Sequence, residues 1–403
     1  MAWLLARLRQ VPDVAIFLVM GALLGPDVAG IVAIKPDSTF NQLALTFGAC
    51  YILSDGGSSL RLQVVSRTWI TIVVLATAGV VITAAITGFA AHHILHTPLV
   101  FAMLLASVIA STDPATLIPV FRQVKVRDRV AQTVMAESAL NDATGAILTF
   151  TVLGIATGTR EFSAGSMLLD LLKQAGIGLA IGVLLGSIVS FLVAHEKHGL
   201  RTEYAAAVSL MAVIGAYLGA EGLQASGFMA VFVFGFTVGN MEAFGLRMGE
   251  AKREKLGRVA AVTTLIARVL IFTLLGAQVD FGLVDRFLAG GIAVVAVFVL
   301  VARPVTVFAC ALPDRRAKWT TNEMLFMCWT RETGVIPGAL AGLLLGMDAP
   351  DAKLIASVTF LAILVTILVQ ATTTRWLARR LGLLEESVTD ADVRGRGKSS
   401  PGE

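Results

Sequence analysis

The chain has 403 residues, of which 56% are hydrophobic and only 15% are charged. Its mean hydropathy of +0.80 excludes an ordinary soluble protein, because a soluble chain of this length would expose many more charged side chains. The net charge of +4 is too small to indicate a nucleic-acid-binding protein.

Twelve apolar runs, separated by short polar turns, predict an all-α protein that crosses a membrane repeatedly, because an open chain can span a bilayer only as helices. The runs lie at about 12–25, 41–60, 69–93, 99–121, 131–156, 167–194, 204–222, 227–240, 259–277, 287–312, 322–347 and 353–374. The first and the eighth are short and rich in glycine, so we expect them to be tilted, broken or re-entrant. Glycines at 227–239 and 338–346 predict close helix packing.

Basic residues gather in alternate turns, and this pattern predicts how the chain is oriented in the membrane. The basic turns contain Arg61 and Arg67; Arg122, Lys125, Arg127 and Arg129; Lys197 and Arg201; Arg247, Lys252, Arg253, Lys255 and Arg258; and Arg315, Arg316 and Lys318. We call the side of these turns the basic face and the other side the opposite face. Because Lys and Arg are enriched on the cytoplasmic side, we expect both termini of this cell-membrane protein in the cytoplasm. The polar tail at 386–403 is expected to be disordered.

The sixth run divides the others into two sets of comparable length, and each set contains an interrupted helix. The interruptions are Thr112-Asp113-Pro114 in the fourth run and Arg331-Glu332-Thr333-Gly334 in the eleventh. Because Pro114 clashes with the carbonyl four residues earlier, we expect the Ala110 carbonyl to be freed from the helix. Two interrupted helices in corresponding halves are typical of inverted-repeat transporters with a binding site at the middle of the membrane.

Three acidic residues, Asp113, Glu137 and Asp142, lie within these apolar runs. A carboxylate at that depth costs about 2.5–3.5 kcal/mol unless something compensates it. Ser138 precedes Asp142 by four residues and shares its helix face, so both can offer oxygen atoms to a small hard cation. Thr112, Asp113 and the freed carbonyls could complete the set of ligands.

Asp142 is the residue that we expect to take part directly in transport. Desolvation disfavours the ionised form of a buried carboxyl group, so we predict that Asp142 gains and loses a proton near neutral pH. A group that holds either a proton or a metal ion is what an exchanger requires. The alternative for Asp142 and Ser138 is a structural polar pair that bridges helices. Asp113 could stabilise the ion or cap the exposed amides of a half-helix.

Glu137 and Asn141 form a second pair with a spacing of four residues. Glu137 suits a structural ion pair better than cation binding. We expect Arg331 to be its partner, because an arginine inside the membrane must find an acid. Arg303, just before Pro304, is instead expected to extend to the membrane surface.

Two further charged residues have open roles. Asp55 lies towards the end of the second run, where it could contact the ion path or cap a helix at the membrane interface. Arg268, in the middle of the ninth run, needs an acidic partner or a water-filled cavity.

Six motifs together resemble the monovalent cation:proton antiporters, in particular their NhaP-like, electroneutral branch, over nearly the whole chain. They are Gly-Ala-Leu-Leu-Gly-Pro from Gly21, Ser-Asp-Gly-Gly from Ser54, Ser-Thr-Asp-Pro from Ser111, Glu-Ser-Ala-Leu-Asn-Asp from Glu137, Gly-Phe-Met-Ala-Val-Phe-Val from Gly227 and Ile-Phe-Thr-Leu-Leu-Gly from Ile271. The motif from Glu137 is highly specific, whereas the glycine-rich motifs are weak alone.

The resemblance implies that Asp142 is the exchangeable carboxylate, that Ser138 and Thr112 are ligands of Na⁺ or K⁺, and that Asp113 lies at the helix crossing. Asn141 stands where the electrogenic branch has a second Asp, which implies the exchange of one cation for one proton. Asp55 stands where some members carry Glu. The family also implies a homodimer and no cofactor besides the transported Na⁺, K⁺ or Li⁺ and H⁺.

The expected organisation is a single transporter domain at 1–385. Scaffold and dimerisation helices at about 11–60 and 204–277 would flank a core ion-transport bundle at about 69–156 and 287–375, with a linker helix at 167–194. In this family the core moves against the scaffold like an elevator. The chain departs from the 13-helix pattern of the family, since residues 1–10 look like a remnant of its first helix. Arg331 is also about two residues out of register with the family's Arg-Gly motif.

Other functions fit the sequence less well. A passive cation channel would use rings of charges or carbonyls from several subunits, and a single asymmetric acid cluster argues against it. A membrane sensor or assembly protein would not need acids beside a broken helix. A membrane enzyme is disfavoured because the sequence has no H-E-x-x-H and no G-x-S-x-G motif.

Overall fold

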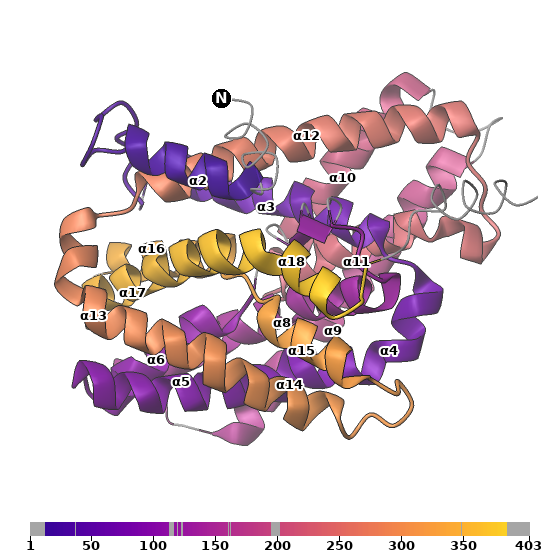
Figure 1. Cartoon of the computed structure of the whole chain (residues 1–403). Helices are drawn as coiled ribbons and strands as arrows, with labels where there is room; N and C mark the ends of the chain where they lie inside the picture. Colours follow the sequence, from indigo (N-terminus) through magenta and orange to yellow (C-terminus); the bar gives the residue numbers. More distant parts are fainter. Residues whose placement is uncertain are drawn as a thin grey trace, which may run out of the picture.

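The computed structural model describes residues 13–384, except residues 37, 113–116, 119, 122–123, 160, 162, 195–201 and 348. Within the described residues every extended regular element is a helix (Figure 1). Seven of these helices are long and apolar enough to cross a membrane, and shorter apolar helices accompany them. The protein is therefore an all-α, multi-pass membrane protein, as the composition predicted.

Each of the predicted apolar runs corresponds to helical structure. In the first half the helices are α2 (Asp13–Leu24), α3 (Thr39–Ser59), α4 (Leu62–Val74), α5 (Val80–Leu95), α6 (Leu99–Ala110), α8 (Asp128–Ala156) and α9 (Ala164–Ala194). In the second half they are α10 (Thr202–Gly222), α11 (Gly227–Gly239), α12 (Glu250–Ala277), α13 (Phe281–Val297), α14 (Arg303–Ala311), α15 (Thr321–Trp329), α16 (Val335–Gly346), α17 (Ala352–Val365) and α18 (Thr372–Arg380). The short helices α2 and α11 are each continuous, so they are not broken.

Single π-helical turns, which are wider than α-helical turns, join several of these helices without ending the membrane crossing. Leu75–Gly79, Phe298–Ala302 and Thr366–Ala371 are π-helical and connect α4 to α5, α13 to α14 and α17 to α18. Such turns re-aim the side chains that follow them. Arg303 comes directly after the second of these turns, and this position affects where its side chain points.

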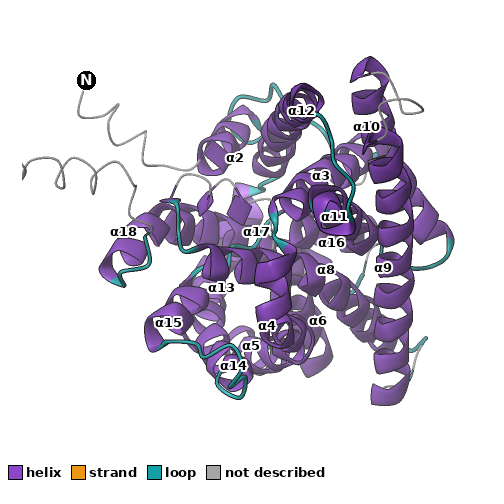
Figure 2. Cartoon of the chain, turned by 90° about the vertical axis from the view of Figure 1, so that its right-hand side faces the viewer, coloured by secondary structure: helices purple, strands orange, loops and turns teal. Residues whose placement is uncertain are grey.

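The helices pack in two groups. In the first, α2 and α3 pack against α12, and α3 also packs against α11. In the second, α5 packs on α6, α4 and α6 on α8, and α13 and α16 on α17. In Figure 1, α2 and α12 lie at the top, α3 and α11 lie below them, and α5, α6 and α14 lie at the bottom. Helix α9 runs from top to bottom on the right of Figure 2, in which α11 and α12 are seen nearly end-on.

Glycines allow the helices of the first group to approach closely. A Cβ atom at Gly235 or Gly239 of α11 would overlap the backbone of Ser54 or Ser58 in α3, so no larger residue fits there. The predicted close packing of the 227–239 stretch is confirmed. In the same group the Arg268 guanidinium of α12 lies 3.3 Å from the Asp13 carboxylate of α2, which supplies the acidic partner that Arg268 requires.

Both predicted interruptions coincide with helix ends. Helix α6 ends at Ala110 and the backbone of Ser111 is extended, while Asp113 and Pro114 lie outside the described residues. Helix α15 begins with a capping box, in which Thr320 and Glu323 satisfy each other's backbone amides, and it ends at Trp329. Helix α16 begins at Val335, after five intervening residues that end at Gly334. The sequence therefore located the breaks in two helices correctly.

The C-terminal end of the described chain helps to define its orientation. The backbone amide of Arg127 donates a hydrogen bond of 2.9 Å to the carbonyl of Leu383, and Val126 forms an isolated antiparallel bridge with Leu384. The segment that follows α18 therefore lies beside Val126 and Arg127, just before α8. This contact puts the end of α18 on the basic face, in agreement with the predicted number of crossings.

Candidate functional site

The predicted site lies on α8, a helix that its neighbours bury over most of its length. Glu137, Ser138, Asn141 and Asp142 are each at most 1% exposed. A surface helix would hide only one stripe of side chains, whereas on α8 every residue from Val130 to Ala139 is buried, which is the whole circumference of the helix. Helix α8 therefore holds two acidic side chains and two polar ones inside the protein, away from lipid.

Asn141 joins α8 to the break after α6. Its Oδ1 accepts a hydrogen bond of 3.0 Å from the backbone amide of Thr112, and its Nδ2 donates one of 2.6 Å to the Thr112 hydroxyl. The same Nδ2 lies 3.2 Å from Oε1 of Glu137. Because the amide of Thr112 is outside any helix, Asn141 replaces the helical partner that it lacks. The role of Asn141 in the structure is thus to hold the broken chain against α8.

Gly145 brings the break close to the face that carries Asp142. Ser138, Asp142 and Gly145 have the spacing i, i+4, i+7 and therefore share one face of α8. A Cβ atom at Gly145 would lie 2.7 Å from Cβ of Ser111, which is nearer than two carbon atoms can pack. The absent side chain at residue 145 therefore lets Ser111 and Thr112 approach the helix face that Ser138 and Asp142 occupy.

The oxygen atoms at this place suit an alkali cation. The hydroxyls of Ser138 and Ser111 are buried, and neither has a hydrogen-bond partner among the residues that the structure describes. A buried hydroxyl without a partner costs about 1–3 kcal/mol, so such groups normally bind something. The Thr112 hydroxyl accepts one bond from Asn141 and keeps a lone pair. Together with the Asp142 carboxylate they provide the oxygen ligands that hard cations prefer.

Asp142 lies at one end of a large cavity of about 1140 Å³. The far end of this cavity is formed by the turns of the opposite face, which contribute Pro36, Thr157, Thr159, Gln224, Met347 and Pro350. Its walls come from both helix groups, since α3, α9 and α10 line one side and α8 and α16 line the other. In this structure Asp142 is therefore reached from the opposite face.

The predicted pairing of Glu137 with Arg331 is wrong, because Glu137 pairs with Arg303. The two Glu137 oxygens lie 3.1 and 2.9 Å from Nη1 and Nη2 of Arg303, and both side chains are 1% exposed. Nε of Arg303 donates a third bond, of 3.1 Å, to the Met327 carbonyl in α15. Arg303 does not extend to the membrane surface as expected, because the π-helical turn before it directs its side chain into the protein.

Arg331 instead donates a hydrogen bond to the carbonyl of Ala110, the one expected to be freed from its helix. Its Nη2 donates to that carbonyl, its Nη1 lies 3.4 Å from the Thr83 hydroxyl, and its guanidinium lies 5.2 Å from the ring centre of Phe298. A cation at the C-terminal end of a helix is stabilised by the helix dipole. Arg331, which lies in the break between α15 and α16, thus caps the C-terminal end of α6.

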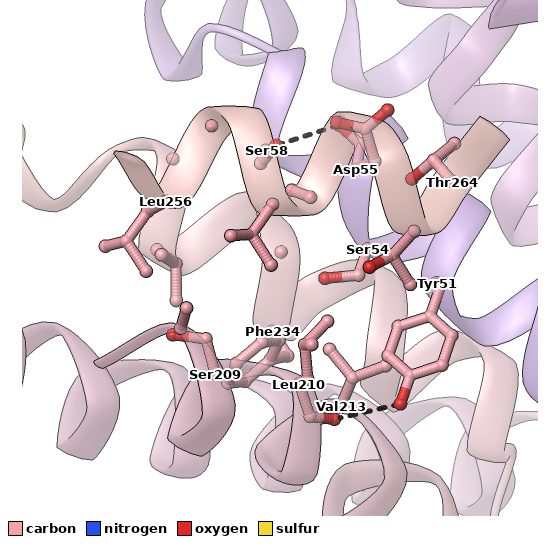
Figure 3. Close-up of a pocket in the computed structure, with 18 of the residues that line it drawn as sticks. Tyr51, Ser54, Asp55, Ser58, Ser209, Leu210, Val213, Phe234, Leu256 and Thr264 are labelled. Carbon is pink, nitrogen blue, oxygen red and sulfur yellow. Dashed lines mark hydrogen bonds between the residues drawn. The ribbon is translucent and has the colours of Figure 1, made fainter. Parts of the chain in front are cut away.

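Two predicted site residues are not placed beside Asp142. Asp113 lies outside the described residues. Asp55 lines a second cavity, between α3, α10, α11 and α12, which shares no lining residue with the cavity of Asp142 (Figure 3). A part for Asp55 or Asp113 in cation binding stays a prediction.

The transmembrane model of sodium/hydrogen exchangers matches residues 1–380, which is nearly the whole chain. The chain belongs to the sodium/hydrogen exchanger family. The resemblance inferred from its motifs is therefore confirmed, and the family consists of transporters rather than enzymes.

Relatives of this exchanger chain include antiporters for different cations. Na⁺/H⁺ antiporter 1 of Methanocaldococcus jannaschii is 30% identical over 347 residues, covering 84% of this chain and 78% of the relative. The K⁺/H⁺ antiporter NhaP of Alkalimonas amylolytica is 30% identical over 381 residues, but this chain spans only 63% of its length. The solved structure of the sodium proton antiporter MjNhaP1 of Methanocaldococcus jannaschii at pH 8 matches with a TM-score of 0.76 and 28% identity, covering 94% of each chain.

Sequence reasoning missed three residues of this exchanger's core. Arg303 was expected to extend to the membrane surface, and Gly145 drew no attention because single glycines are common in membrane helices. Glu332 is fully buried in the second break, yet its motif was used only to place that break and the register of Arg331. A count of charges in the middle of each run would have found Arg303 and Glu332. Nothing in the sequence alone marks Gly145.

The Glu137–Arg303 pair predicts a large coupling energy. We expect Glu137→Gln or Arg303→Gln to lower the free energy of unfolding by about 3–5 kcal/mol each, because either change leaves a buried charge without its partner. The double variant should lose less than the sum of the two. Thermal unfolding in detergent measures all three. The exposed pair of Arg61 and Asp128 provides the control, since Arg61→Gln should cost at most about 1 kcal/mol. Additive losses would contradict the pairing.

The close approach at Gly145 predicts a specific loss of transport. Gly145→Ala should push Ser111 and Thr112 away from α8 and slow ion exchange about tenfold or more, because ligand positions matter at the scale of one ångström. Gly176→Ala in α9 is the matched control, since a Cβ atom there meets no atom within 4 Å. Exchange rates in proteoliposomes measure the effect. Equal rates for the two variants would show that the approach of the break is not required.

Proposed function

We propose that this protein is a secondary antiporter that exchanges Na⁺ for H⁺, with Asp142 binding the two ions in turn. The observation that carries the proposal is the buried Asp142 carboxylate at one end of a large cavity, on the helix face that meets the broken chain. Family membership supports exchange of a monovalent cation for a proton. The hydroxyls of Ser138 and Thr112 would complete the cation site.

The proposed mechanism rests on competition for one carboxylate. An ionised Asp142 is costly at this depth, and either a proton or a cation removes the cost. On binding, the cation would replace its water shell with carboxylate and hydroxyl oxygens of the protein, while a proton would neutralise Asp142 directly. Since the site cannot hold both, loading from one side of the membrane with Na⁺ and from the other with H⁺ couples the two fluxes.

The number of cations exchanged per proton depends on which acidic side chains can gain and lose a proton. Glu137 is held by both nitrogen atoms of a fully buried arginine, so removing its charge would leave Arg303 unpaired. Asn141 carries no charge. Asp142 is then the carboxylate of α8 that can alternate between its two states. We infer the exchange of one Na⁺ for one H⁺, which moves no net charge across the membrane.

We infer alternating access by movement of the second helix group, the core, against the first, the scaffold. Support comes from the cavity of Asp142, whose two walls belong to different groups, so that a relative displacement would close it and could open a path to the basic face. The family resemblance further implies a homodimer held together by the scaffold. The positive-inside rule supports a cell-membrane protein with both termini in the cytoplasm, so the opposite face is the outer one.

Na⁺ is the proposed cation because the matching family model is that of sodium/hydrogen exchangers, and Na⁺/H⁺ antiporter 1 of Methanocaldococcus jannaschii is among the relatives. The K⁺/H⁺ antiporter NhaP of Alkalimonas amylolytica makes K⁺ the specific alternative. Both ions bind oxygen ligands, and cavity size and ligand field decide between them. Exchange rates measured with Na⁺, Li⁺ and K⁺ across a range of pH will identify the cation.

The decisive experiment uses purified protein in proteoliposomes with a preset pH gradient. Adding Na⁺ should collapse the gradient at the same rate whether or not the membrane potential is clamped to zero, because exchange is electroneutral. Asp142→Asn should abolish the response while leaving the protein folded. Asp285→Asn, an exposed acid on α13, is the control and should exchange normally. Retained exchange in Asp142→Asn would overturn the assignment, and an uncoupled Na⁺ current would favour a channel.

The position of the cavity predicts the side from which the site is reached. Ala146 lies four residues after Asp142 and lines the cavity, so Ala146→Cys should react with a membrane-impermeant maleimide added from the opposite face. Ala136→Cys, on the same helix but 2% exposed, should remain unreactive and serves as the control. The native cysteines Cys50, Cys310 and Cys328 are buried and give a low background. Labelling of residue 146 from the basic face alone would contradict the assigned side.

A further inference from the structure

Among the described helices, the chain passes directly from the scaffold to the core at two places. The α3–α4 junction, residues 60–61, lies on the basic face, and the α12–α13 junction, residues 278–280, lies on the opposite face. In Figure 1, α4 lies at the right and α13 begins at the left. Each junction is followed by a helix with a π-helical turn and then by an interrupted helix. The two junctions therefore occupy corresponding positions in the two halves of the chain.

Each scaffold helix is fixed close to its junction by a second scaffold helix. Near the end of α3, a Cβ atom at Gly57 would overlap the backbone of Phe232 in α11. Near the end of α12, a Cβ atom at Gly276 would overlap the backbone of Leu18 in α2. Glycine lets two helix backbones approach this closely, so that each pair packs as one unit. The pairs α3–α11 and α12–α2 therefore form the fixed sides of the two junctions.

The same partner helices hold the first backbone amide of each core helix. Oδ1 of Asn240, at the C-cap of α11, accepts a hydrogen bond of 2.8 Å from the amide of Leu62, the first residue of α4. Oδ2 of Asp27, in the turn after α2, accepts one of 2.8 Å from the amide of Phe281, the first residue of α13. The first amides of a helix have no partner within it, and a side chain just before the helix usually satisfies one of them. Here both acceptors come from the scaffold instead.

The α3–α4 junction can turn but cannot lengthen. Leu60 and Arg61 are already extended, with ψ angles of 144° and 124°, and an extended residue spans at most about 3.3–3.6 Å. Nδ2 of Asn240 donates a hydrogen bond of 2.8 Å to the Leu60 carbonyl, which ties that residue to the scaffold. The next amide, of Arg61, donates one of 2.9 Å to Oε1 of Gln132 in α8, which ties it to the core. Scaffold and core are therefore held together at one point of the backbone.

We propose that the two junctions are matching hinges, with Asn240 and Asp27 as their positioning residues, and that the core rotates about the line joining them. The inference rests on the proposed alternation of access to Asp142. The bonds to the Leu62 and Phe281 amides persist in both states, because a helix can turn about its first amide without leaving the acceptor. The third connection, at 157–163 before α9, is longer and follows the movement. Displacement grows with distance from the hinge line, so the two walls of the Asp142 cavity move relative to each other while the junctions stay in place.

Distances between spin labels in the full-length protein, measured with and without saturating Na⁺, test the movement. Labels on Gln63→Cys and Glu242→Cys, both exposed, flank the first hinge, and their distance should stay the same. Labels on Gln224→Cys and Met347→Cys, on the scaffold and core walls of the cavity, should change their distance. A change in both pairs overturns the hinges but leaves alternating access intact. No change in either pair, while exchange continues, overturns both the hinges and the proposed movement of the core.

The second hinge is tested by exchange kinetics in proteoliposomes. Asp27→Ala removes the acceptor of the Phe281 amide and should lower the maximal exchange rate about fivefold, a difference of roughly 1 kcal/mol. The Na⁺ concentration at half-maximal rate should not change, because the cation site is untouched. Asp27→Asn keeps an acceptor oxygen and should exchange as the wild type does, as should Asp285→Ala, an exposed acid one turn further along α13. A wild-type rate in Asp27→Ala, or equal losses in Asp27→Ala and Asp27→Asn, overturns the role of Asp27.

Discussion

Two ion-paired side chains, Glu137 and Arg303, join three helices at the depth where the chain is interrupted. Glu137 stands on α8, Arg303 begins α14, and the third bond of Arg303 reaches the Met327 carbonyl on α15. Glu137 also accepts from Asn141, which holds Thr112 at the end of α6. Arg331, which follows α15, completes the circuit by capping Ala110 of α6. The two breaks are therefore tied to each other by a closed ring of polar contacts.

This ring explains how unpaired backbone can exist inside a membrane protein. Irregular backbone is tolerated at that depth only where the surrounding protein satisfies its polar groups. Here the side chains Asn141 and Arg331 replace the helical partners of Thr112 and Ala110. These groups are engaged in structure, and Asp142 and Ser138, for which we propose ion binding, lie on the adjacent face of α8. The proposal thus gives structural support and ion exchange to different residues of the same helix.

Most of the fold was predictable because hydrophobic length and basic turns depend on the bilayer rather than on neighbouring helices. The two breaks were predictable for a local reason, namely Pro, Gly and charge within apolar runs. The partner of Glu137 was not. Measured from the basic-face ends of their helices, Glu137, Arg303 and Arg331 lie at similar depths, about 12–15 Å. Depth in the membrane therefore does not distinguish Arg303 from Arg331 as the partner of Glu137. The π-helical turn before Arg303 and the lateral packing of the helices determine which arginine pairs with it.

The contact of Val126 and Arg127 with Leu383 and Leu384 has a mechanical consequence. Residues 125–127 lead directly into α8, the helix that carries Glu137 and Asp142. A pull on the chain beyond Leu384 is therefore carried by α18 and, through these two contacts, by the turn that leads into α8. Its path to the helix of Asp142 does not involve α2, α3, α11 or α12.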